Sequence, residues 1–89
     1  MTEERRWQRL HFRSWHRGTR EMDLLLGSFA DAHLSGFAPN QLDKYEAILA
    51  CTDPDLYNWI TGTEVVPNEH KSEVMNLLLQ HRFQNNRVS

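Results

Sequence analysis

Apolar side chains in this sequence recur at steps of three and four residues, the spacing of one face of an α-helix. The clearest such stripe lies in the segment 22–33. Its members are Met22, Leu25, Leu26, Phe29, Ala30 and His33. Only the short stretch 63–66 comes near the alternation of polar and apolar residues that is typical of a half-buried strand. The periodicity therefore predicts an all-α fold.

Glycine and proline residues mark where the first three helices end and begin. Residues 3–16 form an amphipathic segment. Gly18 follows this segment and separates it from the apolar stripe at residues 22–33. Gly36 follows that stripe, and we expect it to adopt the left-handed conformation that often closes a helix. Pro39 suits the first turn of a third helix, because its φ is already close to the helical value.

Two further helices are expected in the second half. Asp53 precedes Pro54, so Asp53 is expected to cap a short fourth helix whose first turn contains the proline. Gly62 closes this helix, and Pro67 is expected to open a fifth.

Five short helices with brief connections predict a small, bundle-like fold. A chain of 89 residues has room for one domain, so residues 1–89 are expected to form a single helical domain. We place its core at about residues 4–84 and expect a frayed tail at residues 85–89.

The net charge of −2 hides an uneven distribution of charged residues. Residues 1–20 contain six arginines and two glutamates, which gives +4, whereas residues 21–89 contain four basic and ten acidic side chains, which gives −6. Arginine is suited to bidentate contacts with carboxylates and phosphates. The basic end is thus either a contact surface or a solvated helix face, and charge alone does not decide between them.

The composition also suggests a compartment. Cys51 is the only cysteine, which favours a reducing environment. No apolar run approaches the roughly 20 residues of a membrane span. The segment 1–6 has neither the apolar region of a signal peptide nor the composition of a transit peptide. We therefore expect a bacterial cytoplasmic protein that does not associate with a membrane.

No catalytic or metal-binding pattern is found in the sequence. The five histidines have no acidic or thiol partner at the spacing of metal ligands, and no nucleotide-binding glycine loop is present. Cys51 lies close to Asp53 and Asp55, whose charges would raise the pKa of the thiol rather than activate it. We expect a protein that is not an enzyme and binds no metal.

The segment 17–21 combines three features at the junction of the first two helices. Gly18 lacks a Cβ, so the backbone can turn sharply there or be approached closely by another surface. Glu21 falls in the first turn of the second helix, where a carboxylate is favoured, and Arg17 is four residues earlier, within reach of Glu21 if the helix extends that far. An exposed ion pair of this kind contributes only about 0.2–1 kcal/mol. Spacing alone does not distinguish a docking site from a hinge.

This segment resembles a known motif. The run Arg17-Gly18-x-x-Glu21-x-Asp23 is similar to the RGxxE signature of the succinate dehydrogenase assembly factors, also called FAD assembly factors. The block DPDLYNWI at residues 53–60 resembles a second conserved segment of that family, and together the resemblance covers about residues 7–82. One departure is His16, where the family usually has a basic residue.

The resemblance implies both a function and a set of site residues. Members of the family are five-helix proteins that bind the flavoprotein subunit of succinate dehydrogenase, and in bacteria of fumarate reductase, and promote covalent attachment of FAD to it. The FAD then belongs to the partner, and this chain, expected to be a monomer, holds no cofactor of its own. The residues that would contact the partner are His16, Arg17, Gly18, Arg20, Glu21, Asp23 and Trp59. For Trp59 two positions stay open, because burial habits of tryptophan favour the core over an exposed interface by only roughly two to one.

Two other functions are compatible with parts of the sequence. An arginine-rich nucleic-acid-binding module is suggested by the aromatic residues Trp7, Phe12 and Trp15 among the arginines of the first helix. The sequence pI of about 6.2 and the lack of a helix-turn-helix pattern argue against it, so we expect no nucleic-acid partner. An antitoxin-like regulator has no separate support in these residues.

Overall fold

The computed structural model describes the backbone of residues 3–88 and the side chains of residues 5–81. Its elements are α1 (Glu3–Ser14), α2 (Arg20–His33), the 3-10 turn η1 (Leu34–Gly36), α3 (Pro39–Leu49), α4 (Asp53–Thr61), the 3-10 turn η2 (Asn68–His70) and α5 (Glu73–Val88). No strand occurs within residues 3–88. The predicted all-α fold of five helices is confirmed.

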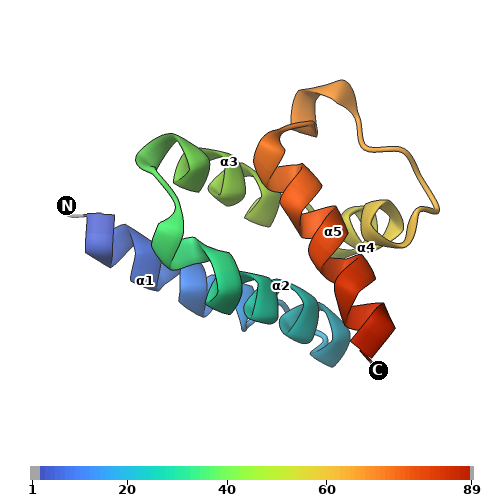
Figure 1. Cartoon of the computed structure of the whole chain (residues 1–89), viewed down its shortest axis with the longest axis horizontal. Helices are drawn as coiled ribbons and strands as arrows, with labels where there is room; N and C mark the ends of the chain where they lie inside the picture. The colour runs from blue at the N-terminus through green and yellow to red at the C-terminus, as the bar shows by residue number, and fades with distance from the viewer. Residues whose placement is uncertain (1–2, 89) are drawn as a thin grey trace.

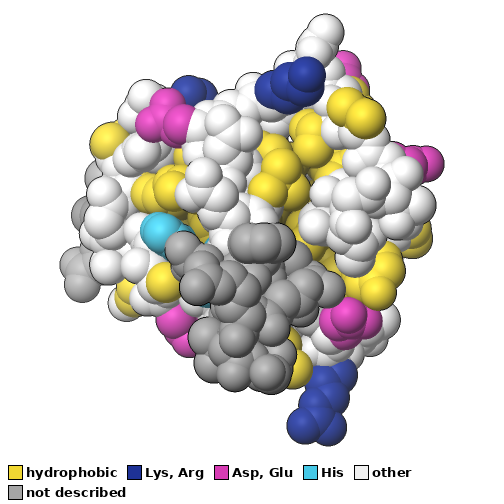
Figure 2. Space-filling view, turned by 45° about the vertical axis from the view of Figure 1, so that its right-hand side comes forward, with side chains coloured by type: hydrophobic (Ala, Val, Ile, Leu, Met, Phe, Trp, Pro, Cys, Tyr) yellow, Lys and Arg dark blue, Asp and Glu magenta, His cyan; other side chains and the backbone are white. Residues whose placement is uncertain are grey.

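One apolar cluster holds the five helices together. Helices α1 and α2 run side by side in opposite directions, α3 lies above them, and α5 crosses beside α4 at the end of the molecule (Figure 1). The stripe predicted on α2 faces inward: Met22, Leu25, Leu26, Phe29 and Ala30 are buried. They pack with buried residues from the other four helices, among them Leu10, Tyr45, Leu56 and Leu78. Hydrophobic side chains still reach the surface in places (Figure 2), as expected where a short chain cannot cover its whole core.

The start of α4 differs from the prediction by one residue. Thr52, and not Asp53, is the N-cap, because its hydroxyl oxygen accepts a hydrogen bond from the backbone N–H of Asp55 at 3.3 Å. Asp53 is therefore the first residue of the helix, and its carboxylate is available for another partner. At the other end, Gly62 closes the helix as predicted, and it does so in a left-handed conformation with φ of +84°.

Two other boundaries were predicted incorrectly. Gly36 is not left-handed, because the chain tightens into the 3-10 turn η1 and Phe37 N–H donates to the carbonyl of Leu34. Pro67 precedes the turn η2 and does not open α5, which begins at Glu73. The residue before α5 is Ser72, whose hydroxyl oxygen accepts a hydrogen bond from Met75 N–H at 3.1 Å. In both cases a short 3-10 turn satisfies backbone groups that the predicted helix end would have satisfied.

Helix α5 continues to Val88, into the segment that we expected to be frayed. Neither glycine nor proline occurs between residues 73 and 88, so no residue forces the helix to stop earlier. Ser89, the last residue of the expected tail, lies outside the described residues, as do Met1 and Thr2.

A buried polar pair joins α1 to α3. The hydroxyls of Ser14 and Tyr45 lie 2.6 Å apart, and Ser14 also donates to the carbonyl of Leu10 at 2.8 Å. Both residues are fully buried. Burial raises the pKa of Tyr45 to about 12, so the phenol remains neutral and keeps its hydrogen. The pair fixes the end of α1, where the RGxxE segment begins.

The contact between α1 and α2 depends on a glycine that the sequence analysis did not single out. Gly27 is buried on α2, and the indole of Trp15 lies against it. A Cβ at position 27 would lie 2.2 Å from Cδ2 of Trp15, far inside van der Waals contact. The indole N–H of Trp15 also donates to Asp31 at 3.3 Å. The absence of a side chain at Gly27 thus allows Trp15 to close the space between the two helices.

Replacing Gly27 with alanine is expected to destabilise the fold by about 1–3 kcal/mol, because the added methyl group must displace the indole of Trp15. Urea denaturation measures the change. Gly36→Ala is the matched control, since a Cβ there meets no atom within 4 Å and φ is not positive. The control should be neutral or slightly stabilising. Equal stabilities of the two variants would show that the Trp15–Gly27 contact is not tight.

Candidate functional site

The RGxxE segment forms the connection between α1 and α2. Thr19 is the N-cap of α2, and its hydroxyl oxygen accepts a hydrogen bond from Met22 N–H at 3.2 Å. Gly18 has φ of +120°, a conformation that side chains with a Cβ rarely adopt. A Cβ placed there would meet no atom within 4 Å, so this glycine faces open space. Gly18 is thus required by the shape of the turn and leaves the backbone accessible from outside.

Arg17 points into the protein and holds the corner between α3 and α4. Its guanidinium donates to the carbonyls of Leu49 at 2.7 Å and Cys51 at 2.9 Å. It also forms an ion pair with Asp53 at 2.8 Å, and the Arg17 side chain is only 11% exposed. The ion pair with Glu21 that the sequence suggested is absent, because α2 begins at Arg20 and residue 17 is outside the helix.

Asp23 holds the other side of the same turn. Its carboxylate accepts a hydrogen bond from the backbone N–H of Arg17 at 2.5 Å. The turn is therefore tied to α2 through Asp23 and to the α3–α4 corner through the side chain of Arg17. These contacts hold the backbone of the turn on both sides of Gly18.

The outer face of this turn carries charged side chains without partners. Arg20 and Glu21 are exposed, and neither side chain forms a hydrogen bond or an ion pair with the described part of the chain. His16 is also exposed, and its ring stacks on that of Phe12 with centroids 3.9 Å apart. Phe12 itself is 62% exposed. The structure thus gathers Gly18, Arg20 and Glu21 on one accessible turn, with His16 beside it.

Trp59 lies elsewhere in the fold. Its side chain is 7% exposed and belongs to the hydrophobic core, the first of the two positions considered from the sequence. Part of the indole lines a pocket between α3, α4 and the segment 62–70. Trp59 is therefore not part of the turn that carries the RGxxE residues.

The internal partners of Arg17 were not predicted from the sequence. Asp53 was assigned to a helix cap, although the preceding Thr52 is itself a residue type favoured at N-caps. That threonine was the available signal that the aspartate could serve another role. The carbonyls of Leu49 and Cys51 carry no signal in the sequence, because any residue supplies a carbonyl.

The thiol of Cys51 is held in its protonated form. Burial raises its pKa, and the nearby carboxylate of Asp55 adds to this effect in the direction predicted from the sequence. The residue also contacts His70, with Sγ 3.7 Å from Nε2. Within the described residues, no three potential metal ligands come together.

Comparison with known proteins identifies the family. The sequence profile described as "Flavinator of succinate dehydrogenase" matches residues 8–82. The chain belongs to this family. Two relatives in the flavinator family are succinate dehydrogenase assembly factor 2, mitochondrial, of Dictyostelium discoideum and assembly factor 2-A, mitochondrial, of Drosophila erecta. Both are 40% identical to this chain, over 83% and 94% of its length.

The chain spans about half the length of these flavinator relatives, 52% and 53% respectively. Their names also correct one expectation. A bacterial cytoplasmic location is contradicted, because the matched relatives are eukaryotic proteins named as mitochondrial. The inference from composition failed since a single cysteine and an unremarkable first segment do not distinguish between reducing compartments. As for membranes, none of the helices within the described residues is long and apolar enough to cross one.

Proposed function

We propose that this chain is a non-enzymatic assembly factor that docks on the flavoprotein subunit of succinate dehydrogenase and promotes covalent attachment of FAD. The flavoprotein subunit of fumarate reductase is a second partner in this proposal, because it too carries covalently attached FAD. The observation that carries the proposal is the accessible turn at Gly18, flanked by the unpaired charges of Arg20 and Glu21 and tied down from within by Arg17 and Asp23.

The residues divide into two roles in this proposal. Gly18, Arg20 and Glu21 contact the partner, with the backbone at Gly18 allowing close approach. Arg17 and Asp23 are positioning residues, because their polar groups are engaged inside the chain. His16 lies at the edge of the contact, and Trp59 supports the fold behind it.

The proposed mechanism needs no catalytic group on this chain. A factor that binds one conformation of its partner more tightly shifts the population toward that conformation. Here the favoured state is the one in which the flavoprotein forms its own bond to FAD, so the FAD belongs to the partner. Cys51 carries the only thiol in the chain, and its pKa is raised. This is consistent with a protein that acts by binding its partner and not by nucleophilic catalysis.

The nucleic-acid alternative gains no support from the arrangement of the arginines. Among the described residues, Arg6 pairs with Asp43 and Glu46, Arg13 with Glu46, and Arg17 with Asp53. A side chain already neutralised in this way contributes less to binding a phosphate backbone.

Affinity capture from cells tests the proposed partner. Tagged wild-type chain is expected to recover a flavoprotein subunit, and in-gel fluorescence under denaturing conditions should show covalently bound flavin in it. Cells that lack the chain should contain the same subunit with much less covalent flavin. Normal flavin fluorescence in the deletion strain, together with the absence of the subunit from the captured material, would refute the proposal.

A further inference from the structure

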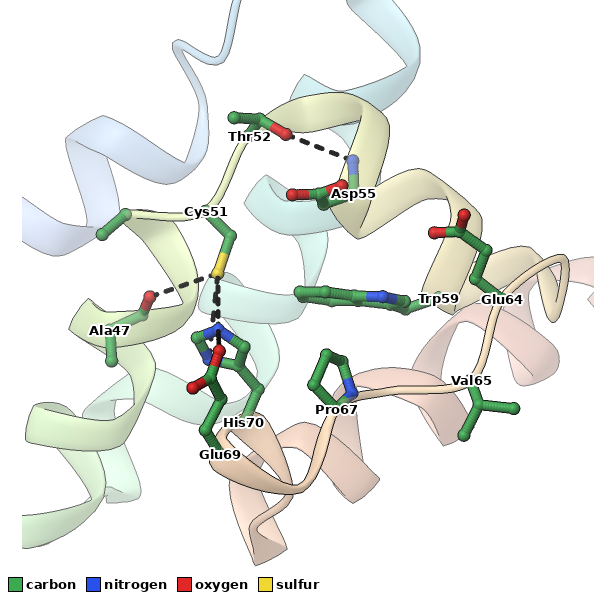
Figure 3. Close-up of a pocket in the computed structure, with 11 residues that line it drawn as sticks. Ala47, Cys51, Thr52, Asp55, Trp59, Glu64, Val65, Pro67, Glu69 and His70 are labelled. Atoms are coloured by element: carbon green, nitrogen blue, oxygen red, sulfur yellow. Dashed lines mark hydrogen bonds and ion pairs between the residues drawn. The ribbon is translucent and has the colours of Figure 1, made fainter.

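A pocket of about 570 Å³ borders the α3–α4 corner that Arg17 holds, but none of residues 17–21 lines it and it has no part in the proposed function. It is formed by the end of α3, the first part of α4 and the segment 62–70, and we call it the Trp59 pocket. The residues that define it are Cys51, Asp55, Trp59, Glu64, Glu69 and His70. In Figure 3, the indole of Trp59 lies across the middle, Cys51 and His70 are at one side, and Glu64 and Val65 are at the other.

Three carboxylates, those of Asp55, Glu64 and Glu69, line the Trp59 pocket together with the imidazole of His70. Among the described residues, neither a lysine nor an arginine lines it, and the nearby guanidinium of Arg17 is engaged with Asp53. The carboxylates of Asp55 and Glu64 form no hydrogen bond or ion pair with the described residues, and that of Glu69 has only the imidazole of His70 at 3.6 Å. The pocket therefore presents negative charge that the chain itself does not neutralise.

The unpaired carboxylates of the Trp59 pocket differ from most other carboxylates of the described residues, which have partners within the chain. Asp43, Asp53 and Glu73 each pair with an arginine or lysine of the same chain. Unpaired carboxylates that surround one hollow attract a cation more strongly than isolated ones, because their potentials add within it.

The walls of the pocket are apolar and suit the stem of a long cationic side chain. The indole of Trp59, the ring of Pro67 and the side chain of Val65 line it together with the carboxylates. Lysine and arginine bury their methylene groups against such surfaces while the charged head reaches polar groups at the rim, and an indole also favours a nearby cation. The volume lies within the range of ordinary ligand pockets, so it accommodates a side chain with its flanking backbone.

A metal ion fits this site less well. Among the described residues, no three side chains of histidine, cysteine, aspartate or glutamate converge closely enough to hold one. A guanidinium or an ammonium group does not need such convergence, because its N–H groups can donate to a single carboxylate.

We propose that the Trp59 pocket is a docking site for a basic segment of a partner protein, which inserts an arginine or lysine side chain between Asp55 and Glu64. The occupant is identified by charge complementarity and by the apolar wall that its stem would cover. The proposal does not depend on which flavoprotein the RGxxE turn contacts.

Titration of the ¹⁵N-labelled chain with the peptide acetyl-Gly-Arg-Gly-amide tests the site. Saturable NMR shifts are expected at the Trp59 indole N–H and at the amides of residues 63–66, with affinity in the millimolar range. The same peptide with citrulline in place of arginine, which is neutral and of equal shape, should bind several-fold more weakly. Equal shifts with both peptides, or no saturable shift with either, would overturn the proposal.

Variants separate the pocket from general acidity of the surface. Glu64→Gln and Asp55→Asn should each weaken peptide binding by about two- to fivefold, the range expected when one partly exposed ion pair is lost. Glu64 is exposed in an irregular segment, so its replacement should leave the spectrum of the folded chain intact. Glu21→Gln is the matched control, an unpaired carboxylate outside the pocket, and should leave peptide binding unchanged. Equal weakening by the control and by Glu64→Gln would contradict the assignment.

Discussion

Replacing Gly18 with arginine is expected to abolish covalent flavinylation of the partner while the chain stays folded. The backbone at Gly18 is open to the outside, so a bulky side chain would stand between the turn and any surface that approaches it. A clash at an interface readily costs more than about 1.4 kcal/mol, which corresponds to a tenfold loss of affinity. In-gel flavin fluorescence of the dehydrogenase subunit, in cells that produce only the variant, measures the effect.

The alanine variant distinguishes bulk from backbone strain. Gly18→Ala carries the same unfavourable φ of +120°, yet its methyl group meets no atom within 4 Å. Both variants should lose stability by about 1–3 kcal/mol from strain, but only the arginine variant should lose flavinylation completely. Wild-type levels of covalent flavin with Gly18→Arg would show that this turn is not the docking edge. A complete loss in both variants would assign the effect to the turn's shape.

Replacing Arg17 with alanine is expected to destabilise the fold by about 2–4 kcal/mol. The change leaves Asp53 without its cation and the carbonyls of Leu49 and Cys51 without their donors, in a site where the arginine is almost completely covered. In a domain of this size, such a loss lowers the melting temperature by roughly 10 °C or more. Thermal denaturation followed by circular dichroism measures it.

Arg20→Ala is the matched control for Arg17→Ala. Arg20 is exposed and has no partner, so its removal should change stability by less than about 0.5 kcal/mol. It should nevertheless reduce capture of the flavoprotein if Arg20 faces the partner. Lysine at position 17 should restore only part of the stability, since a single ammonium group cannot reach all three acceptors. An unchanged melting temperature for Arg17→Ala would show that the internal contacts contribute little.

The structure gives Arg17 of the RGxxE motif a different role from the one that the sequence suggested. From the sequence, Arg17 and Glu21 looked like two halves of one exposed ion pair that could exchange for contacts with a partner. In the structure the two residues have different roles, because Arg17 is bound to the α3–α4 corner and Glu21 is free on the surface. The motif thus combines an internal anchor with an external contact.

Local patterns predicted which segments of the chain are helical. The three- and four-residue spacing on α2 predicted which of its side chains are buried, and Gly62 predicted the end of α4. Both depend on interactions within a few residues of the chain, so the sequence displays them directly. The same reasoning misplaced Gly36 and Pro67, because short 3-10 turns offer the backbone an alternative that differs little in free energy.

Contacts between distant segments were decided only by the tertiary structure. Arg17 and Asp53 are far apart in the sequence, and they meet because α1 and α2 pack against the corner that ends α3. Trp15 lies over Gly27 for a similar reason. The packing of α1 against α2 places the large indole next to a residue that has no side chain. The sequence by itself determined that this chain is helical and that Gly18 interrupts it. Whether the arginine beside that glycine faces a partner or the protein interior depended on helix packing, which no local pattern records.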